Sequence, residues 1–159
     1  MSLKKEVKSR LSDMDEVFFS SKSGETSFLS NFYPCTVKID GKTYNSVEQY
    51  YQSCRVLNPE LAQWVANSPS ALYAKLVIES LKQTRPKDLV EGWYDIKLRI
   101  MKKAIRAKFT QNQELKEKLL ETGTSILHED VKGEDFWGIE GEDMLGKMLM
   151  ELREELKGK

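Results

Sequence analysis

The sequence predicts an α+β fold, a helix-dominated single domain with a small β element near the N-terminus. Two observations lead to this prediction. Beyond about position 45, apolar residues recur at the three- and four-residue spacing of amphipathic helices. Before that position, short apolar stretches alternate with polar residues around turn signals, as in strands and hairpins. With 159 residues, the chain has the length of one domain and can bury a core.

The first part of the chain predicts one helix, one strand and one hairpin. Residues 3–14 suit a helix with four apolar side chains on one face: Leu3, Val7, Leu11 and Met14. Residues 16–19 (EVFF) suit a strand. The segment TVKIDGKTY (36–44) alternates around Asp40-Gly41, a dipeptide that favours a tight hairpin turn.

The remainder predicts a series of helices joined by turns and loops. They are expected at about 45–56, after Pro59, after Pro69, at 88–109, at 112–121 and at 143–157. Proline favours the first turn of a helix, and a glycine such as that in Thr122-Gly123 suits its end. We expect residues 1–159 to form one domain, with a helix at 1–15 on its periphery.

The composition excludes several classes of protein. Hydrophobic residues make up 40% and charged residues 31% of the chain, as in ordinary soluble proteins. No apolar run approaches the ~20 residues of a membrane span, and MSLKKEVKSR lacks the apolar stretch of a signal peptide. We therefore expect a cytoplasmic protein without membrane contact. One histidine and two cysteines do not suit the usual zinc sites, so catalysis is expected to depend on carboxylates, lysines and aromatic side chains, without a metal.

The stretch 93–109 carries a distinctive pattern of charges. At ~100° per residue, one side of this helix is apolar and the opposite side carries four cations, which suit a solvated face: Arg99, Lys102, Lys103 and Arg106. Lys97 and Lys108 fall within the apolar arc. Lys108, near the helix end, is expected to snorkel to solvent. Lys97 lies in the middle of the helix and needs a partner, either a structural carboxylate or a substrate phosphate.

Two segments combine aromatic residues with polar ones. SFLSNFYP (27–34) surrounds Asn31 with three aromatic residues, and GEDFWGIEG (133–141) joins carboxylates and glycines to Trp137. Each pattern suits either a packed core or a site that stacks a flat ring and hydrogen-bonds its edge. His128 is interpreted as an ordinary loop residue.

Glu48, in NSVEQYYQSCR (45–55), has two interpretations. If Asn45 is the N-cap, Glu48 occupies the third helical position and can close a capping box. If Ser46 is the N-cap, Gln49 takes that role instead. The sequence allows both.

Four blocks together resemble the NADAR family, named for NAD and ADP-ribose association. They are FLSNFYP (28–34), IDGKTYNSVEQYYQ (39–52), W-x3-K-x3-M with AIRAKF (93–109), and FWG with LGKMLMELRE (136–154). Their order and spacing extend over nearly the whole chain, from Val17 to Leu156. The resemblance implies N-glycosidase activity, either on phosphoribosyl-linked intermediates of the riboflavin pathway or on ADP-ribose attached to guanine in nucleic acid. It implies no cofactor.

The resemblance also implies roles for individual residues. Glu48 matches the family's glutamate before an aromatic pair, whose second member is Tyr51. The other matches are candidates for catalysis or substrate contact: Asn31, Phe32, Trp93, Lys97, Glu134 with the adjacent Asp135, and Trp137. The sequence departs from the family pattern at four places: Gln49 stands for a frequent His, Asp143 stands for an Asn, Glu134 stands for an Asp, and VIESLKQTR leaves Arg85 as a loose match.

These residue types fit the implied chemistry. Breaking a C1′–N bond develops positive charge on the ribose. A carboxylate such as Glu48 can stabilise this charge, or it can instead activate the attacking water. Glu134 or Asp135 can protonate the departing nitrogen. The expected partner is a small phosphorylated ribosyl or ADP-ribosyl substrate, with ADP-ribosylated nucleic acid as an alternative, and the oligomeric state is left open. A second hypothesis, favoured by Gln49 and Asp143, is a catalytically weak module that binds ADP-ribose or NAD.

Overall fold

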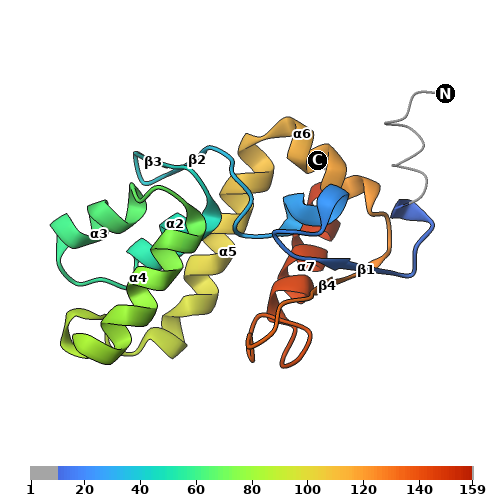
Figure 1. Cartoon of the computed structure of the whole chain (residues 1–159). Coiled ribbons are helices and arrows are strands. Elements are labelled where there is room, and N and C mark those ends of the chain that lie inside the picture. Colours follow the sequence, from blue (N-terminus) through green and yellow to red (C-terminus); the bar gives the residue numbers. More distant parts are fainter. Residues whose placement is uncertain (1–10, 159) are drawn as a thin grey trace. The chain divides into compact units, whose positions relative to one another are not determined.

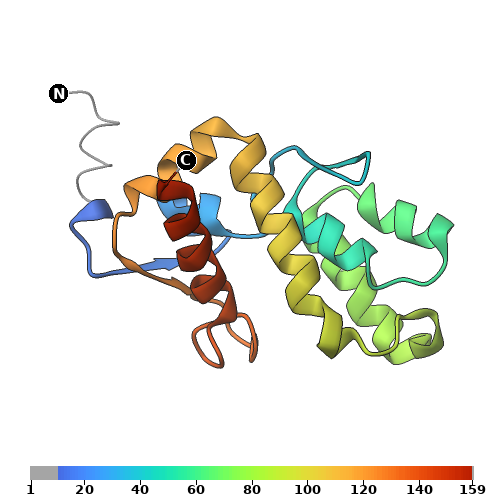
Figure 2. The ribbon, with the colours of Figure 1, turned by 180° about the vertical axis from the view of Figure 1, so that it is seen from behind.

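The computed structural model describes residues 11–158 (Figures 1 and 2). Within them helices dominate and the strands are short, which confirms the predicted fold class. The chain divides into two compact units: a continuous unit, residues 31–112, and a split unit formed by the segments before and after it. None of the described helices is long and apolar enough to cross a membrane. The predicted helix over 3–14 lies outside the described residues except for its last part, where Leu11 and Ser12 are helical.

The continuous unit is built around the short helix α2 (Val47–Ser53). This helix packs against α3 (Pro59–Ala66), α4 (Ala71–Thr84) and α5 (Trp93–Gln111), as Figure 1 shows. Helices α2, α3 and α4 each begin at a polar residue whose side chain accepts a backbone hydrogen bond from the first turn: Ser46, Asn58 and Ser70. Such caps satisfy N–H groups that the helix itself leaves without partners.

The predicted hairpin is confirmed. Strands β2 (Val37–Ile39) and β3 (Lys42–Tyr44) pair antiparallel, with Ile39 opposite Lys42. The two turn residues between them, Asp40 and Gly41, have φ values of 52° and 80°. Two successive left-handed residues are what a two-residue turn of this kind requires, which is why Asp-Gly favours it.

Three predicted helix boundaries are wrong, and two of them have a local cause. The helix expected from residue 88 begins only at Trp93, because a short 3-10 turn, η2 (Pro86–Asp88), and Gly92 at φ 69° precede it. The helix expected to reach Val56 ends at Ser53. The helix after Pro69 begins at Ala71, because Ser70 provides the cap.

The split unit joins strands from its two segments. Strand β1 (Glu16–Phe19), followed by the 3-10 turn η1 (Gly24–Leu29), pairs parallel with β4 (Ile126–Glu129). Helices α6 (Gln113–Glu121) and α7 (Met144–Lys157) pack against each other, and α7 also covers β4 (Figure 2). Strand β1 and both helices were predicted. Strand β4 was not, because ILHE is too short to give a periodic signal and its partner is remote in sequence.

The core of the split unit lies between α7 and the strand pair. Its fully buried side chains include those of Val17, Phe19, Leu127, Leu145 and Leu149. The backbone of α7 comes very close to β4 at Gly146, where a Cβ atom would lie only 1.9 Å from the carbonyl oxygen of Leu127. Only glycine permits this approach.

Candidate functional site

Glu48 does not serve as the helix cap. The N-cap of α2 is Ser46, whose Oγ accepts a hydrogen bond from the Gln49 N–H (3.1 Å) and donates one to Gln49 Oε1 (2.7 Å). Gln49 also donates to the carbonyl of Ser68 (2.8 Å). Of the two interpretations, the pair Ser46–Gln49 is therefore the correct one. Glu48 is nonetheless buried, with 6% of its surface exposed.

Glu48 belongs to a row of side chains on one side of the segment 48–55. Residues 3, 4 and 7 positions further along a helix share its face, and these positions hold Tyr51, Gln52 and Arg55. Gln52 Nε2 donates to Glu48 Oε2 over 3.2 Å. Gln52 and Arg55 were not predicted as site residues, although the helical spacing from Glu48 could have indicated them.

Tyr51 of this row contacts Trp93, the first residue of α5. Trp93 Nε1 donates to the Tyr51 hydroxyl over 3.2 Å, and the two rings meet edge to face with centroids 5.1 Å apart. The Arg55 guanidinium lies 5.2 Å from the centre of the Trp93 ring. Burial lowers the pKa of Arg55, although Tyr51, Glu79 and Glu48 act in the opposite direction. Glu48 and Tyr51, which belong to one motif, thus lie in one group with Trp93 of a separate motif.

Asn31 is held at the start of α2. Its carbonyl oxygen accepts a hydrogen bond from the Glu48 N–H over 3.0 Å, and its Nδ2 donates to Met101 Sδ over 3.5 Å. Its Oδ1 is buried without a hydrogen-bond partner among the described residues, and the same holds for Gln52 Oε1. Leaving a buried polar atom unsatisfied costs about 1–3 kcal/mol. Two acceptors beside Glu48 are therefore open to donors from a bound molecule. Phe32 follows Asn31, and Lys75 Nζ lies 5.8 Å from its ring centre.

The two lysines of α5 differ in burial from what the helical pattern predicts. Lys97 is only half-buried, and its Nζ lies 4.2 Å from the centre of the exposed Tyr94 ring. Lys108, expected to snorkel, is 1% exposed. Burial lowers the pKa of Lys108 to about 8, with Cys35 acting weakly in the other direction. Lys97 still lies one helical turn from Trp93, on the same side of α5.

The remaining predicted residues belong to the loop between β4 and α7 in the split unit. Trp137 is buried and meets Phe136 edge to face, with centroids 4.7 Å apart. Glu134 is half-buried, whereas Asp135 is exposed. A Cβ atom on Gly141 would lie 1.7 Å from the carbonyl oxygen of Asp135. Gly141 is therefore required by the tight folding of this loop.

His128 is not the ordinary loop residue that was predicted. It lies in β4, and both of its ring nitrogens face carboxylates, those of Asp143 and Glu16. No local pattern indicates this group, because its three members are far apart along the chain.

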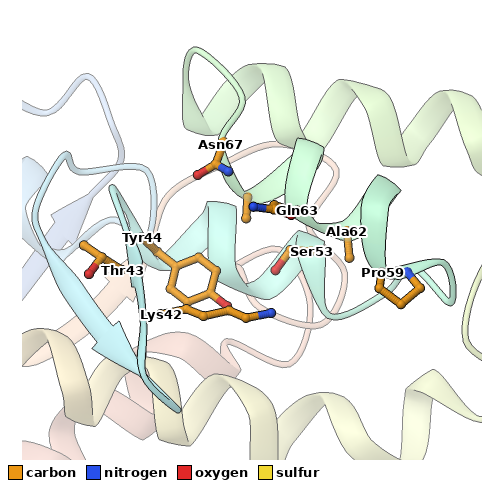
Figure 3. A pocket seen from close by; sticks show the side chains of 9 residues that line it. Lys42, Thr43, Tyr44, Ser53, Pro59, Ala62, Gln63 and Asn67 are labelled. Carbon is orange, nitrogen blue, oxygen red and sulfur yellow. The ribbon is translucent and has the colours of Figure 1, made fainter.

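A cavity of about 320 Å³ lies among β3, α2 and α3 and contains none of the predicted residues. Figure 3 shows Lys42 and Tyr44 on one side of it and Gln63 and Ala62 of α3 on the other. Ser53 is the last residue of α2, and it contributes to the lining. Ser53 is five positions from Glu48 and so lies on a different face of the helix. The cavity is thus separate from the group around Glu48.

Comparisons with known proteins all match this chain to one family of proteins. The family model of the NADAR domain matches residues 17–157. The N-glycosidase YbiA of Escherichia coli K12 is 34% identical over 142 residues, which cover 87% of this chain and 86% of that protein. A riboflavin biosynthesis protein of Vibrio vulnificus is 34% identical over 145 residues, 89% of this chain but only 38% of that protein. The NMR structure of E. coli YbiA matches with a TM-score of 0.78 and 34% identity, covering 91% of this chain and 86% of that one.

Proposed function

Because the chain belongs to the NADAR family, we propose that it is an N-glycosidase in which Glu48 is the catalytic carboxylate. Relatives that match most of the chain carry the name N-glycosidase. One observation carries the role of Glu48: the carboxylate is buried beside an aromatic pair, while Gln49 and not Glu48 takes part in capping α2. A buried carboxylate that capping does not require calls for another role.

The surroundings of Glu48 support a reaction at the C1′–N bond of a ribosyl group. As this bond breaks, positive charge develops on the sugar, and a carboxylate can stabilise that charge or remove a proton from the attacking water. Gln52 Nε2, bound to Glu48 Oε2, fixes the direction of the carboxylate. The open acceptors Asn31 Oδ1 and Gln52 Oε1 suit donors on the sugar or the base.

The other predicted residues take the remaining roles in this proposal. Trp93 and Tyr51 form an aromatic surface suited to a flat base. Lys97, one turn from Trp93, is proposed to bind a phosphate. The departing nitrogen must take up a proton, and Glu134 or Asp135 is proposed as its source, with Trp137 as a further contact. We also propose that both units act as one domain, since the family match covers 17–157.

The substrate is proposed to be a ribosyl phosphate or an ADP-ribosyl compound. The names of the relatives favour a phosphoribosyl intermediate of riboflavin synthesis, and ADP-ribose attached to guanine in nucleic acid is the alternative. Incubation with a ribosylaminopyrimidine phosphate and, separately, with an ADP-ribosylated guanine oligonucleotide identifies the substrate by chromatography of the released base. If the protein hydrolyses neither compound, the proposal is wrong.

A weak ADP-ribose- or NAD-binding module is the competing function. The departures at Gln49 and Asp143 suggested it. Both side chains, however, have local partners: Gln49 bonds to Ser46 and Ser68, and Asp143 bonds to His128. These bonds explain the two residues without a loss of catalysis. Binding without turnover in the incubation above would favour the binding module.

We expect turnover to survive removal of metal ions. The described residues contain no group of three or more His, Cys, Asp or Glu side chains placed to hold a metal, and the proposed steps use carboxylates alone. The test is to measure kcat before and after dialysis against EDTA. A loss that Mg²⁺, Mn²⁺ or Zn²⁺ restores would contradict this expectation.

The change Lys97→Met tests the proposed phosphate contact. Methionine keeps the volume of the side chain but removes its charge. We expect kcat/KM to fall about 10- to 100-fold, the scale of a lost hydrogen bond to a charged group, with unchanged thermal stability. Lys102→Met, on an exposed part of α5, is the matched control and should leave kcat/KM near that of the wild type. Equal activity of both variants would assign Lys97 a structural role only.

A further inference from the structure

His128 lies between two carboxylates within the split unit. Its Nδ1 is 2.5 Å from Asp143 Oδ2, and its Nε2 is 3.0 Å from Glu16 Oε1. The ring also stacks on Phe18, with centroids 5.1 Å apart. A carboxylate only accepts hydrogen bonds, so both ring nitrogens must donate, which requires the protonated imidazolium. The side chains of His128 and Asp143 are only 12% and 17% exposed, so water competes little for the bond between them, whereas Glu16 is 52% exposed.

Asp143 is the residue through which the β4–α7 loop is attached to α7. It has φ 53°, a left-handed conformation that is uncommon outside glycine. Its N–H donates to the carbonyl of Gly138 over 2.9 Å. The next two N–H groups, those of Met144 and Leu145, donate to Phe136 and Trp137 over 3.0 and 3.2 Å.

The residue before Asp143 adds a fourth backbone hydrogen bond to this set. The N–H of Glu142 donates to the carbonyl of Asp135 over 2.9 Å. Four successive N–H groups, at 142–145, thus hold the carbonyls of 135–138. The segment 142–145, which contains Asp143, therefore holds the backbone of Asp135 and Trp137 in place.

We propose that His128 is a positioning residue for the reaction: as an imidazolium, it fixes Asp143 and thereby the loop that carries Glu134, Asp135 and Trp137. His128 itself contacts none of the reacting atoms. The inference rests on the proposed function, because these three loop residues matter for activity only if the chain is an N-glycosidase. The loop is expected to loosen when the imidazolium loses its proton.

The charges around His128 give the direction of the pH dependence. Burial of the ring disfavours the imidazolium, but the hydrogen bonds to Asp143 and Glu16 and their negative charges together outweigh it, so the pKa of His128 is raised above its ordinary 6.5. Asp143 faces the ring from the start of α7 and Glu16 from β1, whereas Lys147 of α7 donates to the carbonyl of Glu142. Glu129, next on β4, points to the other face of the strand.

The sign follows from this raised value. The contribution of the imidazolium to the folded loop is complete below pH 6.5 and is lost as the pH rises through the pKa of His128 in the folded protein. Acidification through the pKa of His128 therefore tightens the loop, and alkalinisation through it releases the loop.

The experiment is an NMR titration, which is unambiguous because His128 is the chain's one histidine. The imidazole signals give its pKa, and the indole N–H of Trp137, assigned with Trp137→Phe, reports on the loop. We expect a His128 pKa above 6.5 and a Trp137 signal that changes with the same midpoint. Asp143→Asn should lower the His128 pKa, whereas Glu142→Gln, the adjacent charge removal, should leave it nearly unchanged. Because the loop loosens as His128 loses its proton, kcat of the wild type should fall as the pH rises through that pKa. In His128→Gln, this fall and the pH response of Trp137 should both disappear.

A His128 pKa at or below 6.5, or a Trp137 signal that ignores the titration, would overturn the proposal. Both measurements use the wild-type protein without substrate. If they succeed while no N-glycoside is hydrolysed, the proposed function fails and the link between His128 and the loop stands. If hydrolysis is present and the Trp137 signal is flat, only the role of His128 fails.

Discussion

Glu48→Gln is expected to leave the protein folded and able to bind its substrate while lowering kcat by about 10²-fold or more, the scale of a lost acid–base group. Glutamine keeps the size of the side chain and one acceptor oxygen. It cannot carry the negative charge that stabilises a ribosyl cation, and it cannot take a proton from water. Substrate binding measured by calorimetry, together with kcat under saturation, separates the two effects.

Glu60→Gln is the matched control for this variant. Glu60 and Glu48 each occupy the second position of a helix, α3 and α2 respectively. Both substitutions remove a negative charge from the N-terminal turn, which costs about 0.3–1 kcal/mol of helix stabilisation. Glu60 is exposed and belongs to no site. If Glu48→Gln loses no more activity than Glu60→Gln, Glu48 is not the catalytic carboxylate.

Gly146→Ala is expected to give the largest loss of stability among the glycine substitutions of α7. The added methyl group would meet the carbonyl of Leu127 at 1.9 Å, a contact between two backbones that no side-chain rotation relieves. Separating α7 from β4 should cost about 3 kcal/mol, offset by about 1 kcal/mol of improved helix propensity. The net loss of about 2 kcal/mol corresponds to a Tm lower by roughly 4–8 °C.

Gly158→Ala provides the comparison at the C-cap of the same helix. This glycine ends α7, is exposed, and would place its Cβ 4.0 Å from the nearest carbonyl oxygen. Urea and thermal unfolding of both variants measure the difference. Equal midpoints would mean that β4 moves aside without cost and that the approach at Gly146 is not a constraint.

Local chemistry explains what could be predicted from the sequence. The Asp40-Gly41 turn, strand β1 and helices α6 and α7 depend on neighbouring residues, and each was predicted close to its observed bounds. The start of α5 depended on the left-handed Gly92, which periodicity cannot reveal. Strand β4 depends on pairing with β1, and no local pattern predicts such a partner.

Some residues of the candidate site could likewise be predicted from the sequence, whereas others depend on the folded structure. Family motifs indicated Asn31, Glu48, Tyr51 and Trp93, and the structure connects them within one unit. Arg55 belongs to no such motif, and only its helical spacing of seven residues from Glu48 could have indicated it. The burial of Lys108 rather than Lys97 depends on the packing around the end of α5, which a helical wheel does not contain. His128 bonds to two carboxylates, Glu16 and Asp143, that come close to it only in the folded chain.

The parallel pairing of β1 with β4 has a consequence for how the protein forms on the ribosome. Glu16 of β1 pairs with Ile126 of β4, so β1 leaves the exit tunnel about 110 residues before its partner exists. Closing a loop of that length costs roughly 4 kcal/mol of chain entropy. The intervening segment, residues 31–112, has its own contacts and is synthesised without interruption. Nascent chains should therefore protect the amides of α2 to α5 before those of β1, and until synthesis nears its end the apolar side chains of Val17 and Phe19 remain open to chaperones and to aggregation.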